Sequence, residues 1–194
     1  MDKKPGSVEE KIIYATIDCI EKYGVSGATN RRIAEKAGVN LAAINYYFRS
    51  KDMLMQRVMV ITLKNAFDLS DMPPMPGLAA PERCIEIFTD LIQGGIRYPG
   101  ITRAHFYNLL AEGKYDALLV QRVNQFIDDL AGDLLERGCQ LAADVLKVAL
   151  IQICSAVMMA VLAPRLFEQH TEINLFDPEN CREYASRLVN KLLA

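Results

Sequence analysis

The chain has 194 residues, of which 51% are hydrophobic and 24% charged, a composition typical of a globular protein of one or two domains and not of a disordered or fibrous chain. The net charge of −2 is unevenly spread: residues 1–64 carry 11 Lys and Arg against 7 Asp and Glu (+4), and the other 130 residues carry 11 against 17 (−6). A basic first third is compatible with a polyanionic partner for that third.

Apolar residues recur at helical spacing almost everywhere, and no alternating strand pattern is visible. In the first third, Ser7 with Glu10 forms a capping-box pattern, Thr29 and Asn40 are good N-caps, and Gly38 permits the left-handed backbone of a tight turn. These signals predict four helices, over residues 7–23, 30–37, 40–48 and 50–69.

The proline-rich stretch over residues 71–81 cannot continue a helix. Beyond it, the pattern predicts five more helices, over residues 81–98, 101–112, 114–137, 139–169 and 178–193. The last begins with Asp177 as cap and Pro178 at the first helical position. We therefore expect an all-α protein of about nine helices, with a helix-turn-helix head of three helices over residues 1–52 and a helical body over residues 53–194.

Residues 148–164 form an uncharged apolar run that is short for a membrane span, so we expect a buried helix and no membrane contact. No signal segment is visible. Five scattered cysteines without a C-x-x-C pair argue against a disulfide framework or a zinc site and favour a reducing cytoplasm. We expect no metal and no cofactor.

The stretch from Arg31 to Phe48, RRIAEKAGVNLAAINYYF, has the spacing of a helix-turn-helix. Ile33 and Ile44 supply apolar contacts between two short helices, Ala34 is small where they cross, and Gly38 makes the turn. In such a motif the second helix enters the major groove of DNA. The alternative is that Tyr46 and Tyr47 only fill a core.

The segments TNRRIAEKAGVN (residues 29–40) and INYYFRSKDML (residues 44–54) resemble the DNA-binding head of the TetR family of transcriptional regulators. The resemblance implies a homodimer whose body holds an effector pocket and whose last two helices form the interface. It also implies phosphate contacts for Thr29, Tyr47 and Lys51 and a base contact for Arg31. Asn45 departs from the family pattern, which usually has tyrosine there.

At the start of the third helix, Leu41, Ala42 and Ala43 carry no donors or acceptors, so they can read only thymine methyl groups and groove shape. Discrimination is then left to polar neighbours, with Arg31 able to take a bidentate guanine contact. The expected DNA-binding residues are Thr29, Arg31, Asn40, Leu41, Ala42, Ala43, Asn45, Tyr46, Tyr47 and Lys51.

Two further sites are expected in the body. Apolar side chains with a few polar tips are the usual make-up of an effector pocket, although the same residues serve equally well as core: Phe88, His105, Phe106, Tyr115 and Met158. Apolar stripes at spacings of three to four residues on the last two helices predict a four-helix dimer interface: Ser155, Met159, Leu162, Leu166, Tyr184, Leu188 and Leu192.

Together these patterns predict a cytoplasmic, dimeric transcriptional regulator, a repressor that binds a palindromic operator in double-stranded DNA and is released by a small-molecule effector. One alternative is a helical small-molecule carrier or partner-docking protein without a regulatory DNA role. Another is an enzyme built on the body. No catalytic motif supports the enzyme, because the sequence has no nucleophile elbow, no H-E-x-x-H and no glycine-rich phosphate loop.

Overall fold

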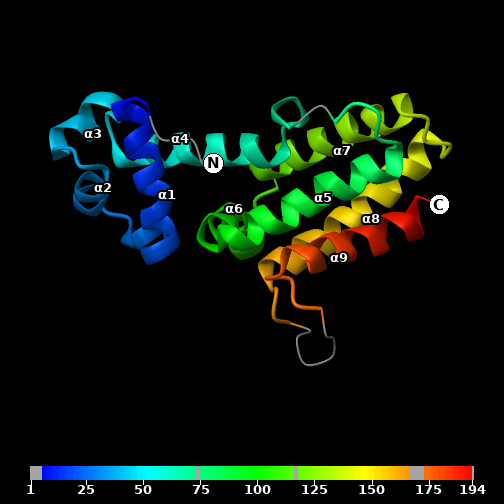
Figure 1. The fold of residues 1–194 in the computed structure, drawn as a ribbon. Helices are drawn as coiled ribbons and strands as arrows, with labels where there is room; N and C mark the ends of the chain where they lie inside the picture. The colour runs from blue at the N-terminus through cyan, green and yellow to red at the C-terminus, as the bar shows by residue number, and fades with distance from the viewer. Residues whose placement is uncertain (1–5, 73–74, 116–117, 167–172, 194) are drawn as a thin grey trace. The chain divides into compact units, whose positions relative to one another are not determined.

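The computed structural model describes residues 6–72, 75–115, 118–166 and 173–193. Within this part of the chain it contains nine α-helices, one short 3-10 helix and no strand (Figure 1), so the all-α prediction is confirmed. The chain divides into two compact units, the first of residues 1–64 with 100–115, and the second of residues 65–99 with 116–194.

The first unit begins with α1 (Val8–Gly27), α2 (Asn30–Ala37), α3 (Leu41–Phe48) and most of α4 (Lys51–Phe67). The predicted capping box of Ser7 and Glu10 is present at the start of α1. The regular turns of α1 stop where predicted, at Gly24, whose φ is 72°. The core that α1 to α4 contribute to this unit is mainly aliphatic and includes one aromatic ring: Ile12, Ile13, Ile17, Ile20, Ile33, Ile44, Phe48, Leu54 and Val58.

Helix α6 (Pro99–Glu112) also belongs to the first unit from Gly100 onward. Its first backbone N–H groups are capped from α1: the Glu21 carboxylate accepts hydrogen bonds from Gly100 N (2.8 Å) and Ile101 N (2.7 Å). A Cβ atom on Gly100 would lie 2.9 Å from Glu21 Cα and from the Ile20 carbonyl oxygen. This close approach fixes the start of α6 against the backbone of α1.

The second unit contains η1 (Leu69–Asp71), α5 (Ala80–Arg97), α7 (Leu118–Glu136), α8 (Ala143–Leu162) and α9 (Pro178–Leu192). Helix α5 packs against α7, α8 and α9 (Figure 1). Phe88 of α5 and Phe126 of α7 are fully buried and meet edge to face. Gly95 allows α5 to approach α8 closely, because a Cβ there would lie 2.7 Å from a methyl carbon of Val161.

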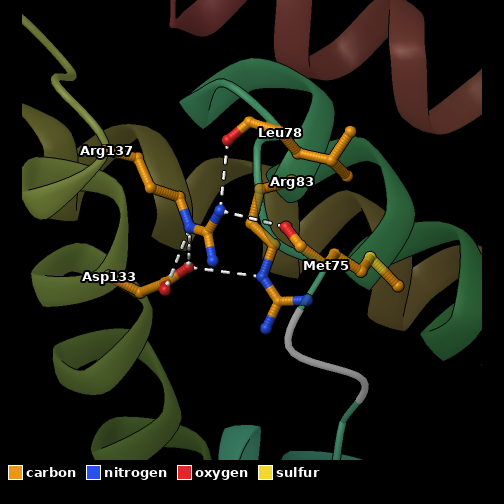
Figure 2. A network of polar contacts seen from close by, with 5 residues as sticks. All are labelled: Met75, Leu78, Arg83, Asp133 and Arg137. Atoms are coloured by element: carbon orange, nitrogen blue, oxygen red, sulfur yellow. Dashed lines mark hydrogen bonds and ion pairs between the residues drawn. The ribbon is translucent and has the colours of Figure 1, made fainter.

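A charged network ties the segment before α5 to the end of α7 (Figure 2). Asp133 accepts from the guanidinium groups of Arg83 (3.3 Å) and Arg137 (3.1 Å). Arg137 also donates to the carbonyl oxygens of Met75 and Leu78. Arg83 is only 3% exposed, so its charge is held by the network rather than by bulk water.

Several predicted helix boundaries are wrong. Helix α8 covers residues 143–162 rather than 139–169. It ends before Pro164, which disfavours a helical conformation for the residue before it; residues 167–169 lie outside the described part. Leu166 therefore lies beyond α8. Helix α7 begins at Leu118 instead of residue 114, after Gly113 with its φ of 62°. Helix α4 ends at Phe67 instead of residue 69.

Helix α8 is long and apolar enough to cross a membrane by length and composition alone. Its inward residues Leu146, Leu150 and Ile153 are nevertheless fully buried in the core of the second unit. A core helix passes the same compositional test. One face of α8 is buried as predicted, whereas Val148 and Ile151 on the other face are exposed.

Candidate nucleic-acid interface

The turn between α2 and α3 is built from local signals in the sequence. The Thr29 hydroxyl caps α2 by accepting from Arg32 N, and Asn40 Oδ1 caps α3 by accepting from Ala43 N at 2.8 Å. Gly38 adopts φ 66° and ψ 34°, the left-handed conformation predicted for it. With Ile33 and Ile44 fully buried, the two short helices form a helix-turn-helix.

The outer face of α3 carries large apolar and aromatic side chains that are exposed. Tyr46 is 81% exposed, Leu41 51% and Tyr47 43%, while Phe48 is buried in the core. The tyrosine rings contact each other edge to face, with centroids 5.1 Å apart. The alternative that both tyrosines are core residues is therefore wrong. Ala42 and Asn45 are also exposed, and Ala43 is half-buried.

Two adjacent arginines of α2 have different environments. Arg32 lies over the ring of Tyr23 and donates to the carbonyl oxygen of Gly27 at 2.8 Å, so it holds the turn between α1 and α2. Arg31 is exposed. The side chain of Arg31 can therefore reach a partner outside the protein, whereas that of Arg32 is engaged within it.

The turn from α3 to α4 has only two residues, and one of them has a rare backbone conformation. Arg49 has φ 64° and ψ −43°, and Ser50 N donates to the Phe48 carbonyl oxygen at 2.7 Å. This is a γ-turn of the strained form. Ser50 Oγ then accepts from Met53 N and caps α4. Lys51, at the first position of α4, is half-buried. Because position 49 is neither glycine nor asparagine, the sequence did not indicate this positive φ.

The expected effector residues are split between the two units. Phe88 is fully buried, and Met158 packs against the same core in the second unit. In the first unit Phe106 is buried and Tyr115 is exposed. His105 Nε2 lies 2.8 Å from Thr62 Oγ1, and burial lowers the pKa of His105 to about 4, so this imidazole is neutral at pH 7. The pocket itself stays a prediction.

Three of the seven expected interface residues are exposed and four are half-buried. Ser155 and Met159 of α8 are exposed, as is Leu166 beyond its end. Leu162, Tyr184, Leu188 and Leu192 are half-buried. The prediction missed the continuation of the stripe toward the start of α8: Val145, Val148 and Ile151 are each more than half exposed. Their spacing of three residues was the available signal.

Comparison with known proteins agrees with this geometry. Residues 12–58 match the family model of bacterial regulatory proteins of the tetR family. The HTH-type transcriptional regulator BetI 1 of Chromohalobacter salexigens is 32% identical over 80 residues, which cover 41% of this chain and 40% of that protein. BetI 2 of the same organism is 40% identical over 62 residues, 32% of this chain and 28% of that protein. The chain thus matches less than half the length of these relatives.

A TetR-like transcriptional regulator from Rhodococcus sp. RHA1 has the same fold. Its crystal structure superposes with a TM-score of 0.59, covers 97% of both chains and shares 16% sequence identity. Family members are transcriptional regulators, not enzymes. The sequence match identifies residues 12–58, from α1 to α4, as a DNA-binding domain of the tetR family of bacterial regulatory proteins, and the whole chain has the fold of a TetR-like regulator.

Proposed function

We propose that this protein is a cytoplasmic, dimeric repressor that binds a palindromic DNA operator and leaves it when a small-molecule effector binds. Residues 1–52 act as the DNA-binding head, and residues 53–194 carry the effector and dimerisation sites. The observation that carries the proposal is the outer face of α3, where large side chains such as Tyr46 stay exposed although the rest of the helix packs tightly.

The polar groups around α3 suit a DNA duplex. Leu41 and Ala42 lie at the exposed start of the helix and can meet thymine methyl groups in the major groove. The caps Thr29 and Asn40 use their side-chain oxygens as acceptors within the protein, which leaves a hydroxyl proton and an amide group to donate to phosphates. Tyr47 and Lys51 supply further phosphate contacts at the end of α3 and the start of α4.

The stripe on α8 supports the dimer. Val148 and Ile151 are aliphatic and more than half exposed, and together with the outer residues of α9 they give a surface that a second copy can cover in a four-helix arrangement. Two heads held in this way match two half-sites of a palindrome.

Release by an effector requires the body to act on the head. Helix α6 offers one connection, because Glu21 of α1 holds its first two N–H groups and Thr62 of α4 contacts His105. An effector that shifts α6 would therefore displace α1 and α4 together. A coupling free energy of about 1–3 kcal/mol is typical between two such sites.

Selection of bound sequences from random duplex DNA tests the proposal. We expect a single palindrome, with affinity that falls steeply as salt rises because phosphate contacts release counterions. Enrichment of no sequence, together with binding that is insensitive to salt, would contradict it and favour a carrier or docking role.

Two variants then separate base contacts from phosphate contacts. Arg31→Ala should reduce the preference for one guanine per half-site by about 1–3 kcal/mol, whereas Lys51→Ala should weaken binding to every sequence alike. The measurement is a titration on the operator, on a duplex with that guanine replaced and on random DNA. An equal loss on all three duplexes for Arg31→Ala would make Arg31 a phosphate contact.

A further inference from the structure

The junction of α3 and α4 contains an arginine in a conformation that favours glycine. Arg49 has φ 64° and ψ −43°, a region that residues with a Cβ atom rarely adopt. Met75 is the other non-glycine residue with positive φ in the described part of the chain. Such conformations persist where surrounding structure imposes them, and they cluster at functional sites.

Neighbouring contacts impose the conformation from both sides. Phe48 and Leu54 are buried anchors on either side of the turn. Arg49 N donates to the Asn45 carbonyl oxygen at 2.9 Å, and Leu54 N donates to the Ser50 carbonyl oxygen at 3.1 Å. The backbone is therefore fixed by the packing of the two helices. Glycine would adopt this backbone conformation without strain. The conformation therefore does not explain why the residue at position 49 is an arginine.

The environment of the Arg49 side chain offers an explanation for the arginine. The residue is exposed, and no hydrogen bond or ion pair of its guanidinium occurs among the residues that the structure describes. It lies between the exposed Tyr47 and the half-buried Lys51. The acidic residue nearest in sequence, Asp52, is exposed in the first turn of α4. A guanidinium offers several donors in a planar fork that matches a phosphate group.

We propose that Arg49 is a DNA-backbone contact, retained in a strained turn because its guanidinium binds a phosphate beside the groove that α3 enters. This inference rests on the proposed DNA-binding function. The strained turn holds the arginine at a fixed point between Tyr47 and Lys51, so its position relative to α3 does not depend on a flexible loop. The contact contributes affinity and register but no sequence preference.

The test compares Arg49→Gly, Arg49→Lys and wild-type protein in thermal unfolding and in DNA titrations over a salt series. Arg49→Gly should raise Tm by about 2 °C, because the strain disappears. It should also weaken binding to operator and random duplex alike, by about tenfold per half-site at low salt, with a salt slope smaller by about one unit per half-site. Arg49→Lys should keep the wild-type slope.

Two control variants isolate the charge and the strain. Arg103→Ala removes an exposed arginine from α6 of the same unit, and Met75→Gly relieves the other positive φ; both should leave the salt slope unchanged. An unchanged affinity and slope in Arg49→Gly, or a loss confined to one base pair, would overturn this inference alone. Failure of wild-type protein to bind any duplex would overturn the proposed function and this inference with it.

Discussion

The two compact units leave different kinds of surface uncovered. The first exposes the tyrosines of α3 and Arg31 of α2, which offer aromatic rings, hydrogen-bond donors and a positive charge. The second exposes an aliphatic stripe on α8 that includes Val148 and Ile151. A surface of the first kind suits a polyanion, and one of the second kind suits another apolar protein face. The kind of side chain that each unit leaves exposed therefore indicates the chemistry of its partner.

The units also differ in how they are held together. In the first, α2 and α3 have eight residues each, too few to be stable alone, and caps and a glycine turn define their ends. In the second, longer helices share a large apolar core, and a charged network closes one end. We therefore expect substitutions in the core and the charged network of the second unit to act mainly on stability, and those on the face of α3 to act mainly on binding.

The largest effect on stability is expected for Asp133→Ala. It removes the carboxylate that pairs with Arg83, a side chain that is 4% exposed, and loss of one partner of a buried pair costs about 3–5 kcal/mol. Chemical unfolding measures this cost. Asp128→Ala on the same helix is the matched control, because the Asp128–Lys147 pair is exposed and contributes at most about 1 kcal/mol. Equal costs for both variants would contradict a structural role for the network.

Ile151→Glu should separate the proposed dimer. The side chain is 53% exposed in the single chain, so the charge should leave folding intact while it prevents burial against a second copy. We expect monomers in sedimentation and at least a hundredfold weaker operator binding, about 2.7 kcal/mol. Leu135→Glu changes an exposed leucine of α7 and should stay dimeric. A dimeric Ile151→Glu protein would exclude this stripe as the interface.

A pH-dependent effect is expected in the first unit. The pKa of His105 is about 4 when folded against an ordinary 6.5, so between these pH values the unfolded chain binds the additional proton. The contribution of His105 to stability is complete above pH 6.5 and is lost as the pH falls toward 4, by at most about 1.4 kcal/mol per pH unit.

His105→Gln can keep a hydrogen bond to Thr62 but cannot take up this proton. Unfolding free energies of both proteins from pH 7 to pH 4 should therefore converge or cross as the pH falls, since carboxylates titrate equally in both. Parallel curves would show that His105 is no more buried than a surface histidine.

The smallest effects are expected for a pair of adjacent glycines in α5. Gly95→Ala should destabilise by about 1–3 kcal/mol, because the new Cβ would lie 2.7 Å from Val161. Gly94→Ala meets no atom within 4 Å and should stabilise by about 0.5–1 kcal/mol. Thermal unfolding distinguishes the signs, and Val161→Ala should partly rescue Gly95→Ala. Two stabilised variants would mean that α5 and α8 are not in close contact there.

The sequence by itself determined the features that depend on local chemistry. Caps at Thr29 and Asn40 and the left-handed turn at Gly38 involve neighbours within a few residues, so their residue types alone indicate the helix-turn-helix. The all-helical class follows in the same way from apolar spacing. Pro164 was also a local signal, and it outweighed the apolar periodicity that suggested a longer α8.

Only the tertiary structure decided which apolar faces are covered and which charges are buried. Val148 and Leu150 are both apolar residues of α8, but the packing of the helices leaves the first exposed and buries the second. Glu21 accepts a hydrogen bond from Gly100 N, 79 residues later, and Arg83 pairs with a carboxylate 50 residues away. The positive φ of Arg49 likewise results from buried anchors on two helices. Such pairings depend on how distant segments meet, and residue type carries no information about that.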